Sequence, residues 1–327
     1  MDDETQNITA APYDPPRPPR TLGQTLDQTF RLIRTHWKLL TGISAVMLAV
    51  LWVIAGLMVG TVMLSGLGHL PQGSPPQWNL RSRAAMGAVF TITMLLYWLT
   101  IPLALAASAD ASVRVDLGVQ TTFREVYRRA LRRLWRYVWL MLVLTLIFVV
   151  PILPLELFGI FSVHSVDHGG TAPAALFFLL PLVFLVLLAY LIFTVLAFLR
   201  LSLVFPVCVA EDVSAMAAIK RSYRLTRGAM GRIFVVALVV YAASYALYLV
   251  VLFAAALLGG GVALVGSLIW SGQVPMAVKV LFFGGLGVLV VAGMSLYMAV
   301  CHAGFMLGLA VVYNDQRLRL EGAVQPQ

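Results

Sequence analysis

The nearest approach to a metal site in this chain is the set His164, Asp167 and His168, in which a carboxylate lies between two histidines four residues apart. Such a set can share a transition metal when a helix brings its members to one face. Gly169 and Gly170 follow directly, and a connection this short seldom holds three ligands. The chain also lacks a glycine-rich nucleotide loop, a His-Glu-x-x-His pair and a Gly-x-Ser-x-Gly elbow. We therefore predict no catalytic residue, no metal and no cofactor, and we expect that the protein is not an enzyme.

Two ionisable residues fall within apolar stretches, where a polar group is costly unless it is paired or hydrated. Glu156 follows Pro151 and Pro154 near the end of one stretch. Both a carboxylate at the outer interface and a residue that lines an opening are consistent with this position. His302 lies beside Cys301 in the last stretch. A neutral imidazole hydrogen-bonded between helices and a proton-relay residue are the two interpretations of His302.

The densest charge lies in residues 121–141, where six arginines precede a long apolar run. At about 100° per residue, the arginines share one face of a helix over 123–137, and most aromatic and aliphatic residues share the other. Such an amphipathic helix suits the headgroup plane of a membrane, where anionic lipids attract its charge.

The same pattern occurs in residues 22–40 and 214–232, with basic residues beside an apolar stripe. The two predicted stripes are Leu22, Leu26, Phe30, Ile33 and Trp37, and Met216, Ile219 and Tyr223. We predict that the three helices contact lipid headgroups or a partner protein through basic residues. The predicted contact residues are Arg31, Arg34, Arg124, Arg128, Arg132, Arg136, Arg200, Lys220, Arg224 and Arg227.

Arg200 differs from the other arginines because apolar residues flank it on both sides, up to Glu211. It falls at the inner boundary of a predicted span. Pairing with a lipid phosphate, pairing with Asp110 or Asp116, and snorkelling of the side chain to the interface remain open.

The composition identifies the elements that position these residues. Of the 327 residues, 61% are hydrophobic and 11% are charged, whereas a soluble domain carries about 25% charged residues. Uncharged runs reach the roughly 18 residues that suggest a membrane-spanning helix. The sequence thus predicts an all-α polytopic membrane protein with six transmembrane helices, at residues 39–64, 84–108, 138–162, 174–199, 233–257 and 280–311.

The basic residues are distributed unevenly between the two sides of these spans. Only Arg81, Arg83 and Lys279 fall in the three short connections on one side, out of 23 Lys and Arg residues. An excess of Lys and Arg marks the cytoplasmic side, so we expect an inner-membrane protein with both termini in the cytoplasm. This placement also argues against nucleic acid as a partner. Gly259, Gly260 and Gly261 interrupt the apolar stretch that contains the fifth predicted span. The sequence therefore leaves open whether residues 258–279 re-enter the membrane.

An internal repeat organises the chain. Residues 30–34 and 223–227 superpose at an offset of 193, and two spans follow each basic helix. We predict three repeats of a basic amphipathic helix plus a helical hairpin, at about 21–110, 111–211 and 212–322. Residues 1–20 are acidic and then proline-rich, which predicts a disordered cytoplasmic tail, and residues 323–327 form a short C-terminal tail.

Three stretches carry a resemblance to a known family: LGQTLDQTFRLIRTHWKLL, RLSLVFPVCVAED followed by AIKRSYRLTRGAMGRIF, and VVYNDQRLRLEG. They resemble the family named for the membrane domain of glycerophosphoryl diester phosphodiesterase, over about residues 21–322. In that family the membrane part is either fused to a soluble phosphodiesterase barrel or stands alone. This chain has no segment that could form the barrel of about 250 residues, so the resemblance implies a stand-alone membrane protein and carries over no catalytic residue.

Three functions are consistent with these observations. The first is a non-catalytic membrane protein that organises anionic lipid or a partner protein, or that forms a homo-oligomer, at the inner leaflet. The second is a transporter or lipid-handling protein, which the repeat and the Pro- and Gly-interrupted spans favour. The third is an intramembrane enzyme, which the lack of an acid–base or metal set disfavours. We expect the first.

Overall fold

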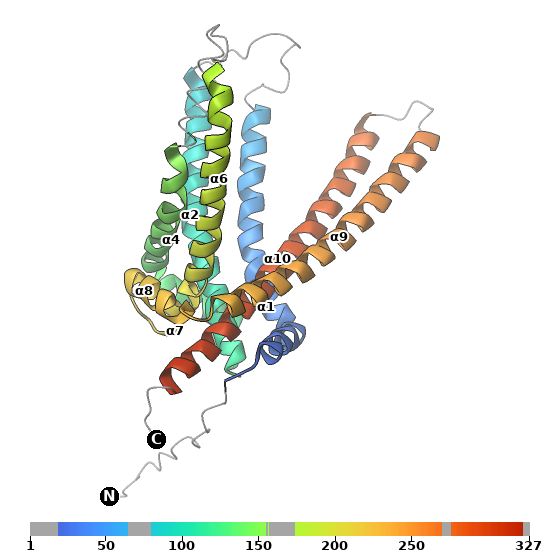
Figure 1. The fold of residues 1–327 in the computed structure, drawn as a ribbon. Helices are drawn as coiled ribbons and strands as arrows, with labels where there is room; N and C mark the ends of the chain where they lie inside the picture. Colours follow the sequence, from blue (N-terminus) through green and yellow to red (C-terminus); the bar gives the residue numbers. More distant parts are fainter. Residues whose placement is uncertain (1–18, 65–79, 155, 157–173, 270–275, 323–327) are drawn as a thin grey trace, which may run out of the picture.

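The computed structural model describes residues 19–64, 80–154, 156, 174–269 and 276–322 (Figure 1). Most of these residues are helical, and none of them lies in a strand. Residues 1–18 and 323–327, the possible metal set His164, Asp167 and His168, and residues 65–79, 157–173 and 270–275 of the short connections lie outside the described residues.

Six long helices form the transmembrane part. They are α1 (Leu22–Leu64), α2 (Leu80–Asp116), α4 (Leu134–Val149), α6 (Ala174–Leu201), α9 (Met230–Ile269) and α10 (Met276–Gly322). In each of the six regions a helical segment is long and apolar enough to cross a membrane. The predicted all-α polytopic fold with six spans is confirmed.

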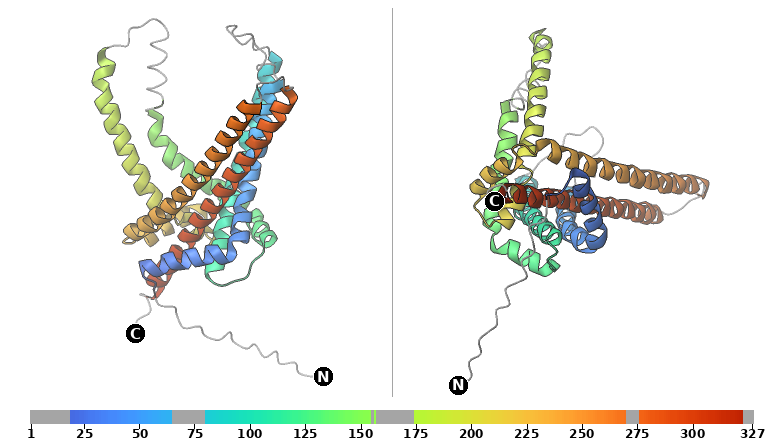
Figure 2. Two further views of the ribbon diagram at one scale, coloured as in Figure 1. Left: turned by 90° about the vertical axis from the view of Figure 1, so that its right-hand side faces the viewer. Right: turned by 60° about the horizontal axis from the view of Figure 1, so that its bottom comes forward.

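Short helices gather at one end of the molecule. They are α3 (Phe123–Arg132), α7 (Val204–Ala210) and α8 (Ala215–Thr226), and the start of α1 and the end of α10 join them (Figures 1 and 2). We call this region the basic end, because the described Lys and Arg residues lie there except Arg81, Arg83 and Lys279. The described chain both begins and ends at the basic end.

A break in the helical backbone separates each short amphipathic segment from the span that follows it. The segment and the span therefore run in different directions. In α1 the break is at His36, with φ −114° and ψ 20°. Arg133, with φ −125° and ψ 22°, separates α3 from α4. Gly228, with φ 83°, lies between α8 and α9, in a conformation that glycine adopts without a steric penalty.

The packed core lies at the basic end rather than in the middle of the spans. Fully buried side chains there include Ile43, Ala107, Val207 and Tyr313, which come from α1, α2, α7 and α10. In the most apolar windows of the spans, only 6% to 28% of residues are buried. Lipid tails solvate apolar side chains as well as a protein interior does, so membrane spans need not bury them.

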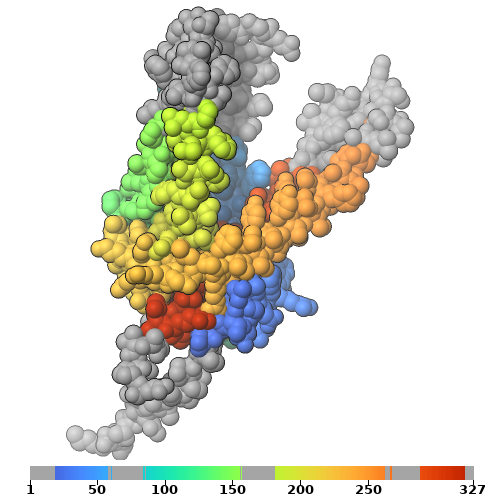
Figure 3. Space-filling model, in the orientation of Figure 1, coloured from blue at the N-terminus to red at the C-terminus, as the bar shows by residue number. Residues whose placement is uncertain are grey.

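The spans are not equally packed against one another. The α9–α10 hairpin leans away from α2, α4 and α6, and the space-filling view shows α9 diverging from α6 above the basic end (Figures 1 and 3). Helix α10 has 47 residues, about 70 Å at 1.5 Å per residue. It therefore exceeds the roughly 30 Å hydrocarbon core, and its last turns contribute to the core of the basic end.

One predicted boundary is wrong. Gly259, Gly260 and Gly261 were expected to end a span and to begin a connection over 258–279, yet they lie within α9. The helix continues to Ile269 and α10 begins at Met276. A glycine costs about 1 kcal/mol in a helix, which the apolar residues on both sides offset because only a helix satisfies their backbone groups in lipid.

Candidate functional site at the basic end

Helix α3 has three faces instead of the predicted two. Val126 and Ala130 are buried, at 0% and 3% exposure, against the protein core. Leu131 is 54% exposed and lies beside the exposed arginines Arg128 and Arg132. The apolar face is thus divided between small residues that contact the protein and larger ones that face outward.

Helix α8 and the start of α1 show the same division. The buried residues are Ala215, Ala218, Ser222, Leu225 and Thr226 in α8, and Thr25 and Thr29 at the start of α1. Ala218 and Ser222 are spaced by four residues, as are Thr25 and Thr29, and Val126 and Ala130. The predicted stripes are divided: Phe30, Trp37, Met216 and Tyr223 are exposed, at 44%, 51%, 52% and 52%, whereas Leu22, Leu26, Ile33 and Ile219 are partly buried and pack against the core. The sequence analysis did not identify Thr25, Thr29, Ala218 and Ser222 as core-facing residues, because it followed the large apolar side chains. The spacing of these small residues by four positions was the signal that could have identified them.

Most predicted contact arginines remain exposed at the surface. Arg124, Arg128 and Arg132 are spaced by four along α3, and no ion pair to them occurs within the described chain. The same holds in that part of the chain for Arg34, Lys220, Arg224 and Arg227, all exposed. Arg31 donates a hydrogen bond to Gln28. These side chains are accessible at the surface of the basic end.

Other arginines join the short helices to the ends of the spans. In α3, Arg129 forms an ion pair with Asp110 of α2 at 2.9 Å. Arg133 and Arg136 both bind Asp212, which follows α7. The predicted contact residue Arg136 is therefore tied to a carboxylate, unlike Arg124.

Asp212 illustrates how these ion pairs act. Its hydrogen bond from Arg136, assisted by the charge of Arg133, holds the pKa of this carboxyl below its usual range. A lowered pKa means that the pair stabilises the fold above the unfolded-state pKa near 3.8 and loses this contribution as the pH falls through the folded-state value. In α3, burial raises the pKa of Tyr127 to about 12, and its protonated hydroxyl donates a hydrogen bond to the Ile43 carbonyl at 2.9 Å.

Two buried carboxylates hold the centre of the basic end together. Asp116 is 3% exposed and accepts hydrogen bonds from Arg20, Gln28 and Asn314. Asp315 is 1% exposed. It accepts hydrogen bonds from the backbone N–H of Arg20 at 2.6 Å, from Arg319 at 2.8 Å and from Arg232. The first residues of the described chain are thereby fixed to α2, α9 and α10.

Arg200 does not pair with Asp110 or Asp116, which bind other residues. Its guanidinium lies over the ring of Tyr223, 4.1 Å from the centroid, and the hydroxyl of Ser222 donates to its carbonyl at 2.8 Å. Of the three alternatives that the sequence left open for Arg200, pairing with Asp110 or Asp116 does not occur, because an aromatic ring of α8 lies against its guanidinium instead of a carboxylate of α2.

Because Arg200 contacts an aromatic ring and not a buried carboxylate, replacing it should reduce the stability of the protein only moderately. We expect Arg200→Leu to lower the free energy of unfolding by about 0.5–2 kcal/mol, measured by SDS titration in mixed micelles. Arg128→Leu, at an exposed position, should change it by less than about 0.5 kcal/mol. Tyr223→Leu should match Arg200→Leu, and the double variant should lose no more than either one. A loss of about 3–5 kcal/mol would instead indicate a buried charge partner.

The two intramembrane candidates lie in different surroundings. His302 Nδ1 is 2.9 Å from Ser44 Oγ of α1, which supports the interpretation as an imidazole bonded between helices. Its Nε2 has no partner among the described residues. Glu156 is exposed, beyond the end of α4 and the short 3₁₀ helix Val150–Ile152 that contains Pro151. The structure does not bring Glu156 and His302 together, and no cluster of potential metal ligands occurs in the described ranges.

Comparison of the chain with protein-family models, with curated proteins and with solved structures gives no match.

Proposed function

We propose that this protein binds and organises anionic lipid at the inner leaflet of a cell membrane. It does so through three basic helical segments, which are the start of α1, α3 and α8. The observation that carries this proposal is their three-faced arrangement. In each helix one face contacts the protein core, large apolar residues such as Phe30, Leu131 and Tyr223 are exposed on another, and basic residues lie beside them. A helix at a membrane surface needs both of the outer faces.

The orientation in the membrane is part of the proposal. The uneven distribution of Lys and Arg favours a cytoplasmic basic end, with both termini on that side. Anionic lipids of the cytoplasmic leaflet then face the exposed arginines. A soluble acidic partner would also suit a basic face, but it would leave Phe30, Trp37 and Trp135 without an apolar environment; Trp135 is 76% exposed.

Replacing Arg124, Arg128 and Arg132 together by glutamine tests the proposal. Each surface arginine contributes about 1 kcal/mol of attraction to an anionic leaflet, so the triple variant should lose up to about 3 kcal/mol before screening. We expect the full chain in mixed phosphatidylglycerol and phosphatidylcholine nanodiscs to lose its enrichment of phosphatidylglycerol, measured by mass spectrometry of the co-isolated lipid.

The matched control is Arg81→Gln, Arg83→Gln and Lys279→Gln, at the far ends of α2 and α10. This variant should keep the enrichment. The enrichment of the native protein should also weaken as salt approaches 1 M, where the Debye length is about 3 Å. Equal enrichment by the native protein and the α3 variant would contradict the proposal.

The resemblance to the membrane domain of glycerophosphoryl diester phosphodiesterases remains a proposal that rests on the three sequence stretches quoted above. A lipid-handling activity is the second candidate. One observation favours it: α10 has apolar cavities on two sides, within its candidate span.

A further inference from the structure

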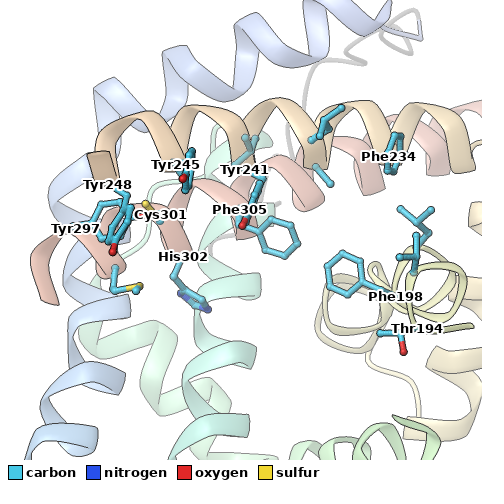
Figure 4. A pocket seen from close by; sticks show the side chains of 17 residues that line it. Thr194, Phe198, Phe234, Tyr241, Tyr245, Tyr248, Tyr297, Cys301, His302 and Phe305 are labelled. Atoms are coloured by element: carbon cyan, nitrogen blue, oxygen red, sulfur yellow. The ribbon is translucent and has the colours of Figure 1, made fainter. Parts of the chain in front are cut away.

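Two cavities lie against α10 just above the basic end. The first, of about 780 Å³, lies between α6, α9 and α10 and includes Tyr241, Tyr245 and Tyr297 in its wall (Figure 4). The second, of about 500 Å³, lies between α10 and the helices α2, α4, α6 and α7. Both are lined by Phe198, His302 and Phe305. These three residues form a common wall of the two cavities.

An aromatic stack marks this common wall. The rings of Phe198 from α6 and Phe305 from α10 are 5.9 Å apart between centroids, with an interplanar angle of 27°. Figure 4 shows the two rings next to each other between their helices. A long apolar ligand can therefore occupy one side of the stack or the other, and a ligand with two chains can occupy both.

The cavities open toward lipid rather than toward water. The residues that line them belong to candidate membrane spans. Several of these side chains are partly exposed at the sides of the helices, including Phe198 at 44%, Leu238 at 50% and Tyr241 at 69%. At these positions the surrounding medium is hydrocarbon, so an acyl chain is the molecule available to fill the space.

The cavities also lie near the depth of lipid ester groups. Phe198 precedes Arg200 by two residues, a rise of about 3 Å along the helix. If Arg200 marks the headgroup boundary, the aromatic stack lies about half a turn inside it. Ester carbonyls of a glycerolipid lie between the headgroup and the acyl chains, and thus near this level.

His302 supplies an unused polar group at the same wall. Its Nδ1 contacts Ser44 Oγ, while Nε2 lacks a partner in the described part of the chain. When the Ser44 hydroxyl donates to Nδ1, the proton of the neutral ring is on Nε2, which is then a donor. A buried donor without an acceptor costs about 1–3 kcal/mol. Nε2 is enclosed by the surrounding side chains, so an ester carbonyl satisfies it once the ring turns toward the cavity.

We propose that the two cavities hold the two acyl chains of one glycerolipid from the leaflet at the basic end. One chain lies on each side of the stack of Phe198 and Phe305, and an ester carbonyl accepts a hydrogen bond from His302. Volumes of 780 and 500 Å³ fall within the range of about 300–1,000 Å³ for ligand pockets. The site recognises the apolar part of the lipid, so it does not depend on the headgroup attraction proposed above.

Photolabelling of the full chain in vesicles tests this site. The probes are phosphatidylglycerol and phosphatidylcholine, each with a diazirine on one acyl chain, and labelled residues are identified by mass spectrometry. We expect both lipids to label residues 237–248 and 297–305 more strongly than the exposed residues of α4. Ala237 lines the larger cavity, and Ala237→Phe should reduce the cavity labelling severalfold. Ala246→Phe, on an exposed face of the same helix, should leave it unchanged.

A second variant and a cross-linking experiment complete the test. If Ala237→Phe unfolds, Ser244→Phe fills the same cavity from the next turns of α9 and should have the same effect. Labelling that survives the filling substitution would overturn the proposal. So would bismaleimide cross-linking between two copies through Tyr241→Cys, in a chain with Cys208 and Cys301 replaced by alanine, because a second copy would then occupy the cavity.

The two lipid probes separate this proposal from the surface site. Equal labelling by both probes supports the cavity even if the α3 arginine variant retains its lipid enrichment. Labelling by phosphatidylglycerol alone, lost in the α3 arginine variant and unaffected by Ala237→Phe, would show surface binding and contradict an acyl-chain site.

Discussion

Asp315→Asn should lower the free energy of unfolding by about 3–5 kcal/mol, because it removes the charge from one member of a buried ion-pair cluster. The Asp315 side chain is 1% exposed, and the Arg232 side chain with which it pairs is 15% exposed. Asparagine keeps the size of the side chain but leaves Arg232 and Arg319 without their negative partner. SDS titration of the purified protein in mixed micelles measures the loss.

Asp212→Asn is the matched control, because it makes the same chemical change in an exposed pair. The Asp212 side chain is 47% exposed, and an exposed pair contributes about 0–1 kcal/mol. Its backbone φ is 53°, in the left-handed region that asparagine tolerates well. If Asp315→Asn cost no more than Asp212→Asn, the cluster around Asp315 would not hold the basic end together.

Tyr313→Ala should have an effect of similar size for a different reason. Tyr313 is fully buried, and removing a large buried ring costs about 3–5 kcal/mol through the cavity that it leaves. Its hydroxyl also donates to Glu211 Oε1 at 3.1 Å. Tyr313→Phe removes only the hydroxyl and should cost about 1–3 kcal/mol, so the two substitutions separate packing from hydrogen bonding.

Tyr241→Ala provides the comparison for the same residue type at a surface position. Tyr241 is 69% exposed, and surface substitutions usually change stability by less than about 0.5 kcal/mol. All three variants are compared in detergent micelles by the same titration. Equal losses for Tyr313→Ala and Tyr241→Ala would place the stabilising core elsewhere than at the basic end.

The position of the core at the basic end reflects where the hydrophobic effect can stabilise a membrane protein. Within the hydrocarbon, apolar side chains gain little by leaving lipid for protein. At the interface, burial again removes apolar surface from water, and carboxylates and arginines can pair with partial hydration. This accounts for the concentration of Ile43, Ala107, Val207 and Tyr313, and of the ion pairs, at one end of the spans.

The sequence by itself determined the fold class, the six spans and the three amphipathic segments, because these depend on local composition and periodicity. Charge-free runs of sufficient length identify membrane helices, and a spacing of three or four residues identifies a helix with distinct faces. The exposed arginines Arg124, Arg128 and Arg132 were among the predicted contacts for the same reason. The three repeats and the tails remain predictions from the sequence.

Only the tertiary structure decided which face of each helix is buried and which charges are paired. Thr25 and Thr29, rather than Phe30 and Trp37, face the core because close helix packing at the basic end favours small side chains. Asp315 meets Arg20 from the opposite end of the chain, a contact between distant segments that no local pattern encodes. The pairing of Arg200 with Tyr223 and the cavities beside His302 likewise depend on how separate helices approach each other. The residue types in each helix limit the interactions that it can make. The relative positions of the packed helices decide which of these interactions form.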